Sequence, residues 1–360
     1  MSEERVAIIL GAGATRAEAM RKPDARRPPL DRGFFSQAIR ARVIGLGPVS
    51  KYMRDHYNES LDDPARDSLE RVMAILYTDL FGGDLEHEAY SALRTLTQIF
   101  VRRLAETTND IPIHSKRRLY RLIIGFLNKG VLPANITLIT FNQDIQAEKT
   151  LDAIRETQLR AKQTVFSFPG CYRLPRPVRV TGPVGGDTNV FDANEQGEDG
   201  IAVLKLHGSL NWYSRHNSSA PSRKRLFDPA RQIAITTRKE INPSMTLELP
   251  DRSTLKFTVP IVIPPVVHKS GILHNDLKPV WTLAEERLGA ADRVVIFGYS
   301  CPPNDWESAN LVCRAIRRER RRSEVSVIDP DPRALLRYVE LGGLEAVNYY
   351  ASASAYLGAE

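Results

Sequence analysis

Short runs of β-branched and other apolar residues recur along the chain and constrain its fold more strongly than any other feature. Each run is apolar at consecutive positions, as in strands that are buried on both faces of a sheet. Most runs lead into a stretch with helical periodicity, which is typical of parallel strands joined by helical crossovers. The predicted strands are Val6–Leu10, Ile136–Thr140, Val203–Leu206, Arg293–Phe297, Glu324–Ile328 and Glu345–Asn348. We therefore predict an α/β fold with a doubly wound parallel sheet of about six strands.

The long stretch between the first two predicted strands has mainly helical periodicity and contains no comparable strand. The predicted helices of this stretch are Leu61–Leu80, Glu86–Glu106 and Ser115–Asn128. We expect residues 31–130 to form a large helical insertion after the first strand. The core would then consist of residues 1–30, 131–213 and 259–360.

A second excursion from the core is predicted over residues 214–258. Apolar and polar residues alternate there in Gln232–Thr237 and Thr246–Leu249, which indicates a β-hairpin. Residues 179–200 are rich in Gly, Asn and Asp, and we expect them to form a long mobile loop.

Composition excludes several classes of protein. Hydrophobic residues make up 42% and charged residues 26% of the chain, which is ordinary for a globular protein. No run approaches the roughly 20 apolar residues that a membrane span needs, and Val6–Leu10 is too short for a signal-peptide core. We therefore expect a cytoplasmic protein with no membrane partner. Cys171, Cys301 and Cys313 are too widely spaced for a C-x-x-C pair, so no metal is predicted.

The formal charge of +7 makes the protein mildly basic, but the charge is spread too thinly to identify a partner. The densest cluster reads RAIRRERRR at positions 314–322. We interpret it as the solvated outer face of a helix, with a nucleic-acid or partner patch as the alternative. No aromatic residue is interleaved there to stack on bases, so nucleic acid is expected only as an indirect partner.

The first predicted strand is followed by a glycine-containing loop that suits a phosphate ligand. Gly11, Ala12 and Gly13 come directly after the strand, and Thr15 and Arg16 follow. Glycines let a backbone turn tightly and approach a pyrophosphate, while free amides at a helix start point toward its charge. Arg16 takes the place of the third glycine of the usual G-x-G-x-x-G pattern. A purely structural turn is the alternative, and Arg16 can equally be a phosphate contact or a surface residue.

Two further loops carry groups suited to catalysis. Asn142 and Asp144, two positions apart after the second strand, can offer an amide and a carboxylate to one small ligand, or can cap a helix. His207, followed by Gly208, is suited to proton transfer to a substrate that approaches closely, although a lone histidine can also be structural.

The last loops supply contacts of the kind that nucleotides use. Gly298 allows close backbone approach and Ser300 can donate to a phosphate, while Asp305 is expected to cap the helix that follows. Asp329 ends a late strand, where a carboxylate can accept both ribose hydroxyls of an adenosine and favours NAD over NADP. Turn formation is the other role open to Asp329.

In this order, these motifs resemble those of the sirtuin superfamily, and especially its divergent bacterial sirtuin-like branch. The matching segments are GAG at 11–13, T-x-N-x-D at 140–144, HG at 207–208 and GYS at 298–300, with further similarity at Pro28–Phe35 and Ile261–Trp281. The ordered set spans most of the chain. The resemblance implies a Rossmann-like NAD-binding core.

The resemblance also implies roles for individual residues. Asn142 would hold the ribose and a water near the anomeric carbon, Asp144 would bind the nicotinamide carboxamide, and His207 would act as a base toward a ribose hydroxyl. Including those predicted from the loops, the expected NAD contacts are Gly11, Ala12, Gly13, Thr15, Arg16, Asp31, Asp144, Gly298, Ser300 and Asp329. Asn142 and His207 are the expected catalytic residues.

Deacylase sirtuins carry a four-cysteine zinc module, whereas no cysteine lies between Cys171 and Cys301 here, which argues against an acyl-lysine peptide channel. The large helical insertion resembles the branch used in anti-phage defence, whose members hydrolyse NAD⁺ to nicotinamide and ADP-ribose. We therefore expect an NAD glycohydrolase and a homo-oligomer, with a HerA-type ATPase or another sensor protein encoded nearby as a partner implied by analogy. The alternatives are a deacylase or ADP-ribosyltransferase, and a non-catalytic subunit that senses NAD or ADP-ribose.

Overall fold

The central sheet of the protein is fully parallel. The computed structural model describes residues 3–82, 85–157, 165–174, 178–181, 189–191, 200–214, 233–236, 245–248, 254–257, 260–262, 277–302, 305–318, 324–342 and 347–359. The six strands of the central sheet are β1 (Val6–Leu10), β2 (Ile136–Thr140), β5 (Ala202–Lys205), β11 (Arg293–Phe297), β12 (Glu324–Ile328) and β13 (Val347–Tyr350). Their order across the sheet is β13-β12-β11-β1-β2-β5, and every neighbouring pair is parallel.

This strand order confirms the predicted fold class. Numbered by appearance within this sheet, the strands run 3-2-1-4-5-6, which is the order of the Rossmann-like doubly wound fold. The chain reverses its direction of travel between β1 and β11. Ligands of such sheets bind beyond the carboxyl ends of the strands at this switch point. A ligand site is therefore expected at the loops after β1 and β11.

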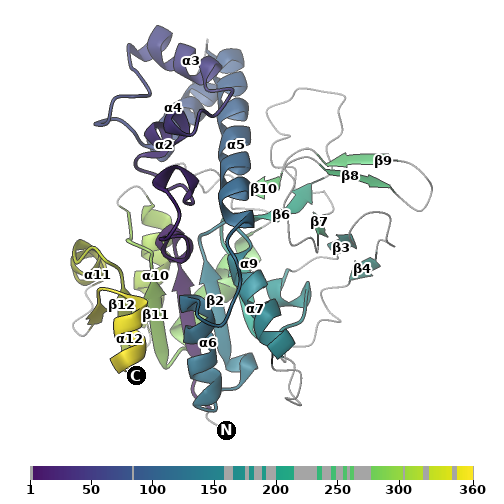
Figure 1. Cartoon of the computed structure of the whole chain (residues 1–360), viewed down its shortest axis with the longest axis vertical. Helices are drawn as coiled ribbons and strands as arrows, with labels where there is room; N and C mark the ends of the chain where they lie inside the picture. The colour runs from purple at the N-terminus through teal and green to yellow at the C-terminus, as the bar shows by residue number, and fades with distance from the viewer. Residues whose placement is uncertain are drawn as a thin grey trace.

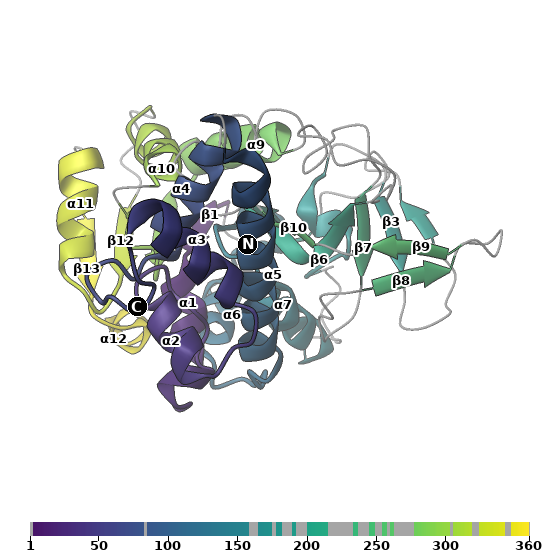
Figure 2. The same ribbon diagram turned by 90° about the horizontal axis from the view of Figure 1, so that it is seen from above.

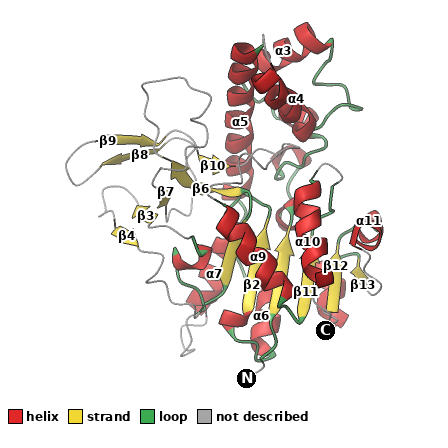
Figure 3. Ribbon diagram, turned by 180° about the vertical axis from the view of Figure 1, so that it is seen from behind, coloured by secondary structure: helices red, strands yellow, loops and turns green. Residues whose placement is uncertain are grey.

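Helices cover both faces of the sheet, which explains why the strands are apolar at consecutive positions. The first layer contains α6 (Arg118–Asn128), α7 (Gln146–Thr157) and α12 (Ala353–Ala359), with α6 in contact with the other two. The second contains α9 (Lys278–Gly289), α10 (Trp306–Arg318) and α11 (Arg333–Gly342), with α10 in contact with both neighbours. Figure 1 shows the first layer in front of the sheet, and Figure 3 shows α9 and α10 from behind. All five residues of β1 are buried between these layers.

The predicted helical insertion stands over the carboxyl edge of the sheet (Figures 1 and 2). After β1 the chain forms α1 (Ala12–Glu18), α2 (Phe34–Arg40), α3 (Gly47–Tyr57), α4 (Leu69–Gly82) and α5 (Glu86–Asn109). Short 3-10 turns occupy Asp24–Arg26, Pro133–Asn135 and Gly170–Tyr172. The long helix α5 packs against α3 and α4 through buried apolar residues such as Met53, Met73 and Leu96. None of the helices within the described residues is long and apolar enough to cross a membrane.

A second sheet lies beside the core (Figure 1). Its strands are β3 (Val178–Thr181), β4 (Asn189–Phe191), β6 (Gly208–Ser214), β7 (Ile233–Thr236) and β10 (Pro260–Val262), in the order β10-β6-β7-β3-β4. The strands β8 (Met245–Glu248) and β9 (Thr254–Phe257) pair as a separate antiparallel hairpin. The hairpin falls inside the predicted excursion at 214–258, but the second sheet also takes strands from outside that range.

The structure corrects three details of the sequence prediction. The expected loop at 179–200 is wrong at 179–181 and 189–191, because the β-branched residues there pair as β3 and β4. The helix expected to start at Leu61 starts at Leu69, where Asp31 accepts hydrogen bonds from the start of the helix. Strand β5 is displaced by one residue, and the last strand runs to Tyr350.

Strand β12 of the parallel sheet contains a buried hydroxyl that allows a stability test. Ser326 is 0% exposed, and its Oγ has no hydrogen-bond partner among the described residues. An unpaired buried hydroxyl costs about 1–3 kcal/mol, so Ser326→Ala is expected to raise the free energy of unfolding by about 1 kcal/mol. Urea unfolding followed by circular dichroism measures this change. A loss of stability would show that the hydroxyl is paired in solution.

Candidate functional site

The loops after β1 and β11 meet at the switch point of the sheet, and three glycines make this contact possible. The amide of Gly13 donates to the carbonyl oxygen of Gly298 at 2.9 Å, and the amide of Gly11 donates to the carbonyl oxygen of Phe297 at 3.1 Å. A Cβ on Gly11 would lie 2.4 Å from the Gly298 oxygen. Gly298 has φ +63°, and a Cβ there would lie 2.1 Å from the amide nitrogen of Ala14. Packing of two backbones, and not only approach of a ligand, therefore requires these glycines.

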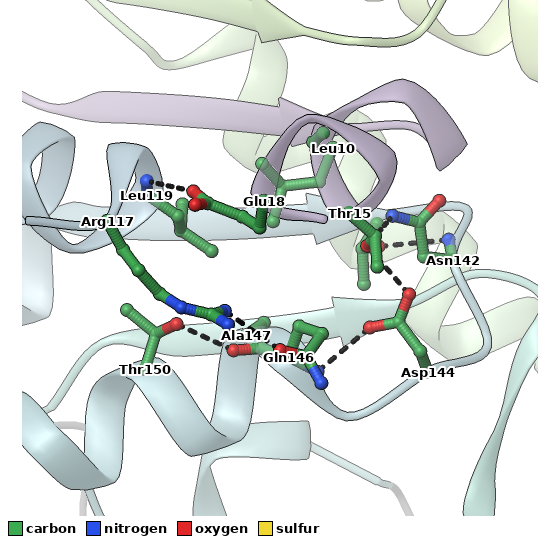
Figure 4. Close-up of a pocket in the computed structure, with 12 residues that line it drawn as sticks. Leu10, Thr15, Glu18, Arg117, Leu119, Asn142, Asp144, Gln146, Ala147 and Thr150 are labelled. Carbon is green, nitrogen blue, oxygen red and sulfur yellow. Dashed lines mark hydrogen bonds between the residues drawn. The ribbon is translucent and has the colours of Figure 1, made fainter. Parts of the chain in front are cut away.

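Asn142, Thr15 and Asp144 form a buried hydrogen-bonded cluster beside this loop contact (Figure 4). The Nδ2 atom of Asn142 donates to the Gly11 carbonyl at 2.8 Å and to Thr15 Oγ1 at 3.1 Å, and Thr15 Oγ1 donates to Asp144 Oδ2 at 2.7 Å. Because the Gly11 carbonyl can only accept, the amide orientation of Asn142 is fixed. Its Oδ1 atom has no partner among the described residues and remains available as an acceptor.

Asp144 is held from three directions. Its Oδ1 accepts from the amide of Gln146 at 2.8 Å, and its Oδ2 accepts from Thr15. Its carbonyl oxygen accepts from Nζ of Lys205, which is fully buried and also pairs with Glu148 at 3.0 Å. Lys205 ends β5, two residues before His207, so this buried ion pair ties the loop after β2 to the loop after β5.

A cavity of about 20 Å³ lies behind the cluster, and Arg117 contributes the most unusual side chain of its lining (Figure 4). Arg117 is 3% exposed, and its Nη1 donates to Gln146 Oε1 at 3.0 Å. Its Nη2 has no hydrogen-bond partner among the described residues. Burial lowers the pKa of this guanidinium, while the nearby carboxylates of Glu18 and Asp144 act in the opposite direction. A cavity of this size admits about one water molecule, to which Nη2 can donate.

Arg117 and Gln146 connect the helical insertion to the cluster. Gln146 donates through Nε2 to the carbonyl oxygen of Thr108 in α5 at 2.9 Å, and its own amide holds Asp144. Glu18 of α1 accepts from the amide of Leu119 at 3.0 Å and so caps the start of α6. The insertion is thereby fixed to the loop that carries Asn142 and Asp144.

His207 lies at the neighbouring strand end, packed among aromatic rings. The Phe141 ring centroid is 5.3 Å from that of His207 and 4.3 Å from that of Tyr299, so Phe141 joins the loops after β2, β5 and β11. Trp281 lies on another side of the imidazole at 6.2 Å, and its Nε1 donates to the Leu206 carbonyl at 2.9 Å. Gly208 has φ +75°, a conformation that favours glycine and turns the chain from β5 into β6.

The loops after β11 and β12 complete the carboxyl edge. Ser300 is half-buried, and its carbonyl oxygen accepts from Arg337 at 2.8 Å. Asp329 is buried, with Oδ1 accepting from the amide of Asp331 at 2.9 Å. Burial raises the pKa of this carboxyl, and the hydrogen bond from Asp331 offsets part of the effect. The hydrogen bond from Asp331 offsets only part of the cost of burying this carboxylate, so the carboxylate is suited to accept further hydrogen bonds from hydroxyl groups of a ligand.

Two residues predicted to contact a cofactor make hydrogen bonds that support the insertion. Arg16 donates to the Pro28 carbonyl at 2.9 Å and pairs with Asp24. Asp31 accepts from Ser68 Oγ at 2.9 Å and from the amide of Glu70 at 2.7 Å, so it caps α4. Ala12 is exposed at the start of α1. The remaining predicted residues lie at the carboxyl edge of the sheet, as their positions after strands imply.

The structure adds site residues that the sequence pattern does not identify. Arg117, Gln146 and Lys205 reach the cluster from outside the strand-end motifs. Ser308 of α10 lies beside His207 and donates to Asp305, which precedes that helix. Only Asp305 carried a signal, as a residue before a helix, and its carboxylate accepts hydrogen bonds from Ser308 and Tyr299. Within the described residues, no group of three or more His, Cys, Asp or Glu residues could hold a metal ion.

No protein-family model matches the chain, and no curated protein sequence matches it. Among solved structures, the chain is similar to a Sir2 homologue in complex with NAD, with 14% identity over 99% of this chain and 87% of that chain and a TM-score of 0.45. It is also similar to a triple mutant of a Sir2 homologue in complex with 2′-O-acetyl ADP-ribose, with 14% identity over 99% and 90% of the two chains and a TM-score of 0.43. A third is Sir2Tm bound to a propionylated peptide, with 12% identity over 95% of each chain and a TM-score of 0.35. Such slight likeness carries no argument about this chain, whose fold class follows from its own sheet order.

Asp329 provides a test of ligand binding that is independent of catalysis. Because burial raises its pKa, the ionised carboxylate destabilises the folded state at pH values above the unfolded pKa of about 3.9. Asp329→Asn is therefore expected to stabilise the protein at pH 7, and this gain should shrink as the pH falls through the folded-state pKa. The sequence-based prediction that Asp329 contacts an adenosine ribose further implies that this change weakens NAD binding about 10-fold, through loss of one charge-assisted hydrogen bond.

Thermal unfolding between pH 4 and 8 and calorimetric titration with NAD measure the two effects of Asp329→Asn. The control is Asp331→Asn, because the pKa of the exposed Asp331 is lowered by its hydrogen bond with Arg333. That variant should gain no stability and should bind NAD normally. Equal NAD affinity in both variants would remove Asp329 from the binding site.

Proposed function

We propose that this protein binds NAD⁺ at the carboxyl edge of its parallel sheet and hydrolyses the bond between nicotinamide and ribose. The observation that carries the proposal is the buried cluster in which Asn142 is fixed with its Oδ1 as a free acceptor. His207 lies at the end of the neighbouring strand. The resemblance of the strand-end motifs to those of sirtuins supports the same assignment.

The proposed reaction needs no covalent nucleophile. Nicotinamide leaves as a neutral molecule when the bond between C1′ and the pyridinium nitrogen breaks and its electron pair returns to the ring. An oxocarbenium-like ribose results, and a water oxygen bonds to C1′. The proton that this water loses replaces the one that a ribose hydroxyl gives to His207, and His207 releases its proton to solvent. The barrier is lowered mainly by orientation of that water and by stabilisation of the positive ribose.

Each residue of the site has one task in this reaction. Asn142 Oδ1 accepts a hydrogen bond from the water or from a ribose hydroxyl, and so aligns the attack on C1′. His207 accepts a proton from a ribose hydroxyl. Asp144 contributes to binding of the nicotinamide carboxamide, and its two hydrogen-bonded oxygens hold a fixed position for that contact. Gly11, Gly13 and Gly298 shape the loops beside the pyrophosphate, while Asp329 accepts from the adenosine ribose.

The biological role that we propose is depletion of NAD in anti-phage defence. The helical insertion supports this role, because it resembles that of defence proteins and is fixed directly to the loop of Asn142 through Arg117 and Gln146. We further propose that the protein acts in the cytoplasm as a homo-oligomer. A HerA-type ATPase is the proposed partner, because a resting enzyme must be silent until a sensor activates it.

The deciding experiment measures nicotinamide release from NAD⁺ by the purified protein, alone and with the product of the neighbouring gene. Equimolar nicotinamide and ADP-ribose are expected. Addition of an acyl-lysine peptide with labelled NAD⁺ separates hydrolysis from transfer, since label on the peptide or an acylated ADP-ribose would indicate a transferase or deacylase. Tight calorimetric binding of NAD without release of nicotinamide under any of these conditions would assign a sensor function and reject the enzyme.

A further inference from the structure

A buried chain of hydroxyl and carboxyl groups connects His207 to the start of α10. Ser308 Oγ lies 3.4 Å from His207 Nε2 and donates to Asp305 Oδ1 at 2.6 Å. The other carboxyl oxygen of Asp305 accepts from the hydroxyl of Tyr299 at 3.1 Å. All four side chains are buried.

The direction of these hydrogen bonds follows from the number of protons available. Burial raises the pKa of Tyr299 well above its ordinary value, so its hydroxyl keeps its proton and donates to Asp305. The short contact from Ser308 places the single hydroxyl proton of this residue on the Asp305 side. Toward His207, Ser308 therefore presents only lone pairs, and the facing nitrogen must carry the hydrogen.

We propose that Ser308 and Asp305 are positioning residues that keep a proton on Nε2 of His207 and leave Nδ1 as its basic atom. The proposal rests on the proposed function for the task of His207, but not for the tautomer itself. The neutral imidazole has one N–H and one lone pair, so a fixed acceptor beside Nε2 selects the tautomer with the lone pair on Nδ1. The rings of Phe141 and Trp281 limit rotation of the imidazole and preserve this choice.

The same arrangement assists the proton transfer. When the O–H bond of a ribose hydroxyl breaks and its proton bonds to Nδ1, His207 becomes an imidazolium with N–H groups on both nitrogens. The Nε2–H group donates more strongly to Ser308 Oγ, which Asp305 already polarises. The carboxylate thus stabilises the positive ring through an intervening hydroxyl, without itself accepting a proton. In hydrolases with a catalytic triad, a carboxylate that accepts a hydrogen bond directly from the catalytic histidine stabilises the imidazolium in the same way.

The test uses Ser308→Ala and a spectroscopic measurement that does not require turnover. Protein with ¹⁵N-labelled histidine is studied by two-bond ¹H–¹⁵N correlation without NAD, and the His207 signals are assigned by their loss in His207→Gln. We expect wild-type His207 to show a single neutral tautomer with the proton on Nε2, and Ser308→Ala to show a mixture. The matched control is Ser326→Ala, which removes an equally buried hydroxyl that has no partner among the described residues.

The kinetic part of the test compares kcat and KM for nicotinamide release. Ser308→Ala is expected to lower kcat on the order of 10- to 100-fold with KM nearly unchanged, as is usual when a supporting hydrogen bond of a functional group is lost. Ser326→Ala should keep wild-type kcat. Thermal unfolding establishes that each variant is folded.

The outcomes separate this proposal from the proposed function. If no protein form cleaves NAD but the tautomer still depends on Ser308, the positioning role stands and the enzymatic function fails. If NAD is cleaved while Ser308→Ala keeps both the wild-type tautomer and the wild-type kcat, the positioning role is overturned. A wild-type protein that carries the proton on Nδ1 would also overturn it.

Discussion

Replacement of Asn142 by alanine is expected to slow nicotinamide release by about 10²–10³-fold, and replacement of His207 by alanine by about 10²–10⁴-fold. Asn142→Ala removes the acceptor proposed to align the attacking water, and His207→Ala removes the proposed base. Because Asn142 also donates to Gly11 and Thr15, its loss should lower the free energy of unfolding by about 1–3 kcal/mol without unfolding the protein. Initial rates of nicotinamide release with saturating NAD measure the catalytic effect.

The controls for these two variants replace the same residue types far from the site. Asn348→Ala changes an exposed residue whose contact with Glu324 is 3.4 Å long, and His56→Ala changes a residue of the insertion that pairs with Glu88. Both should keep the wild-type rate. Wild-type turnover by folded Asn142→Ala and His207→Ala would remove the proposed active site altogether.

Gly298→Ala is expected to lower the free energy of unfolding by about 3–5 kcal/mol. The new Cβ would require a left-handed backbone at φ +63° and would lie 2.1 Å from the backbone nitrogen of Ala14. No side-chain rotation relieves a contact between Cβ and backbone, so the loops after β1 and β11 must separate. The melting temperature should fall on the order of 10 °C, and NAD binding should weaken because the two loops form one side of the site.

The matched control for this change is Gly125→Ala in α6. Nothing lies within 4 Å of a Cβ at Gly125, and alanine is a better helix former than glycine by about 1 kcal/mol. The same substitution should therefore stabilise the protein at Gly125 and destabilise it at Gly298. Equal melting temperatures for the two variants would contradict the close packing of the loops.

The central sheet could be predicted from the sequence because burial on both faces leaves a pattern that needs no knowledge of neighbours. Val6–Leu10 and Ile136–Thr140 are strands with the predicted bounds. The second sheet was harder to predict from the sequence, because β3 and β4 are very short and lie in a stretch rich in loop-forming residues. Among the described strands, β4 pairs only with β3, and β3 joins the rest of the second sheet through β7, which lies far away in the sequence.

Some residues of the candidate site could be predicted from the sequence and others could not. Residues directly after strands, such as Asn142 and His207, could be found because the end of a buried strand can be located from sequence. Lys205 has the pattern of an ordinary strand residue, and only the fold shows that its charge meets Glu148 in the interior. No sequence pattern identifies Arg117 or Ser308, because their roles depend on helices that pack against the sheet from other parts of the chain.

The position of β1 in the middle of the sheet has a consequence for synthesis of the protein. Val6 pairs with Ile136 on one side and with Arg293 on the other, so β1 must wait for a partner strand that is made much later. Synthesis proceeds at about 5–20 residues per second, and Gly298, Ser308 and Asp329 all leave the ribosome after β11. A nascent or truncated chain that ends before β11 therefore lacks half of the site. In the proposed NADase, the site is therefore incomplete until β11 and the segment that follows it have been made.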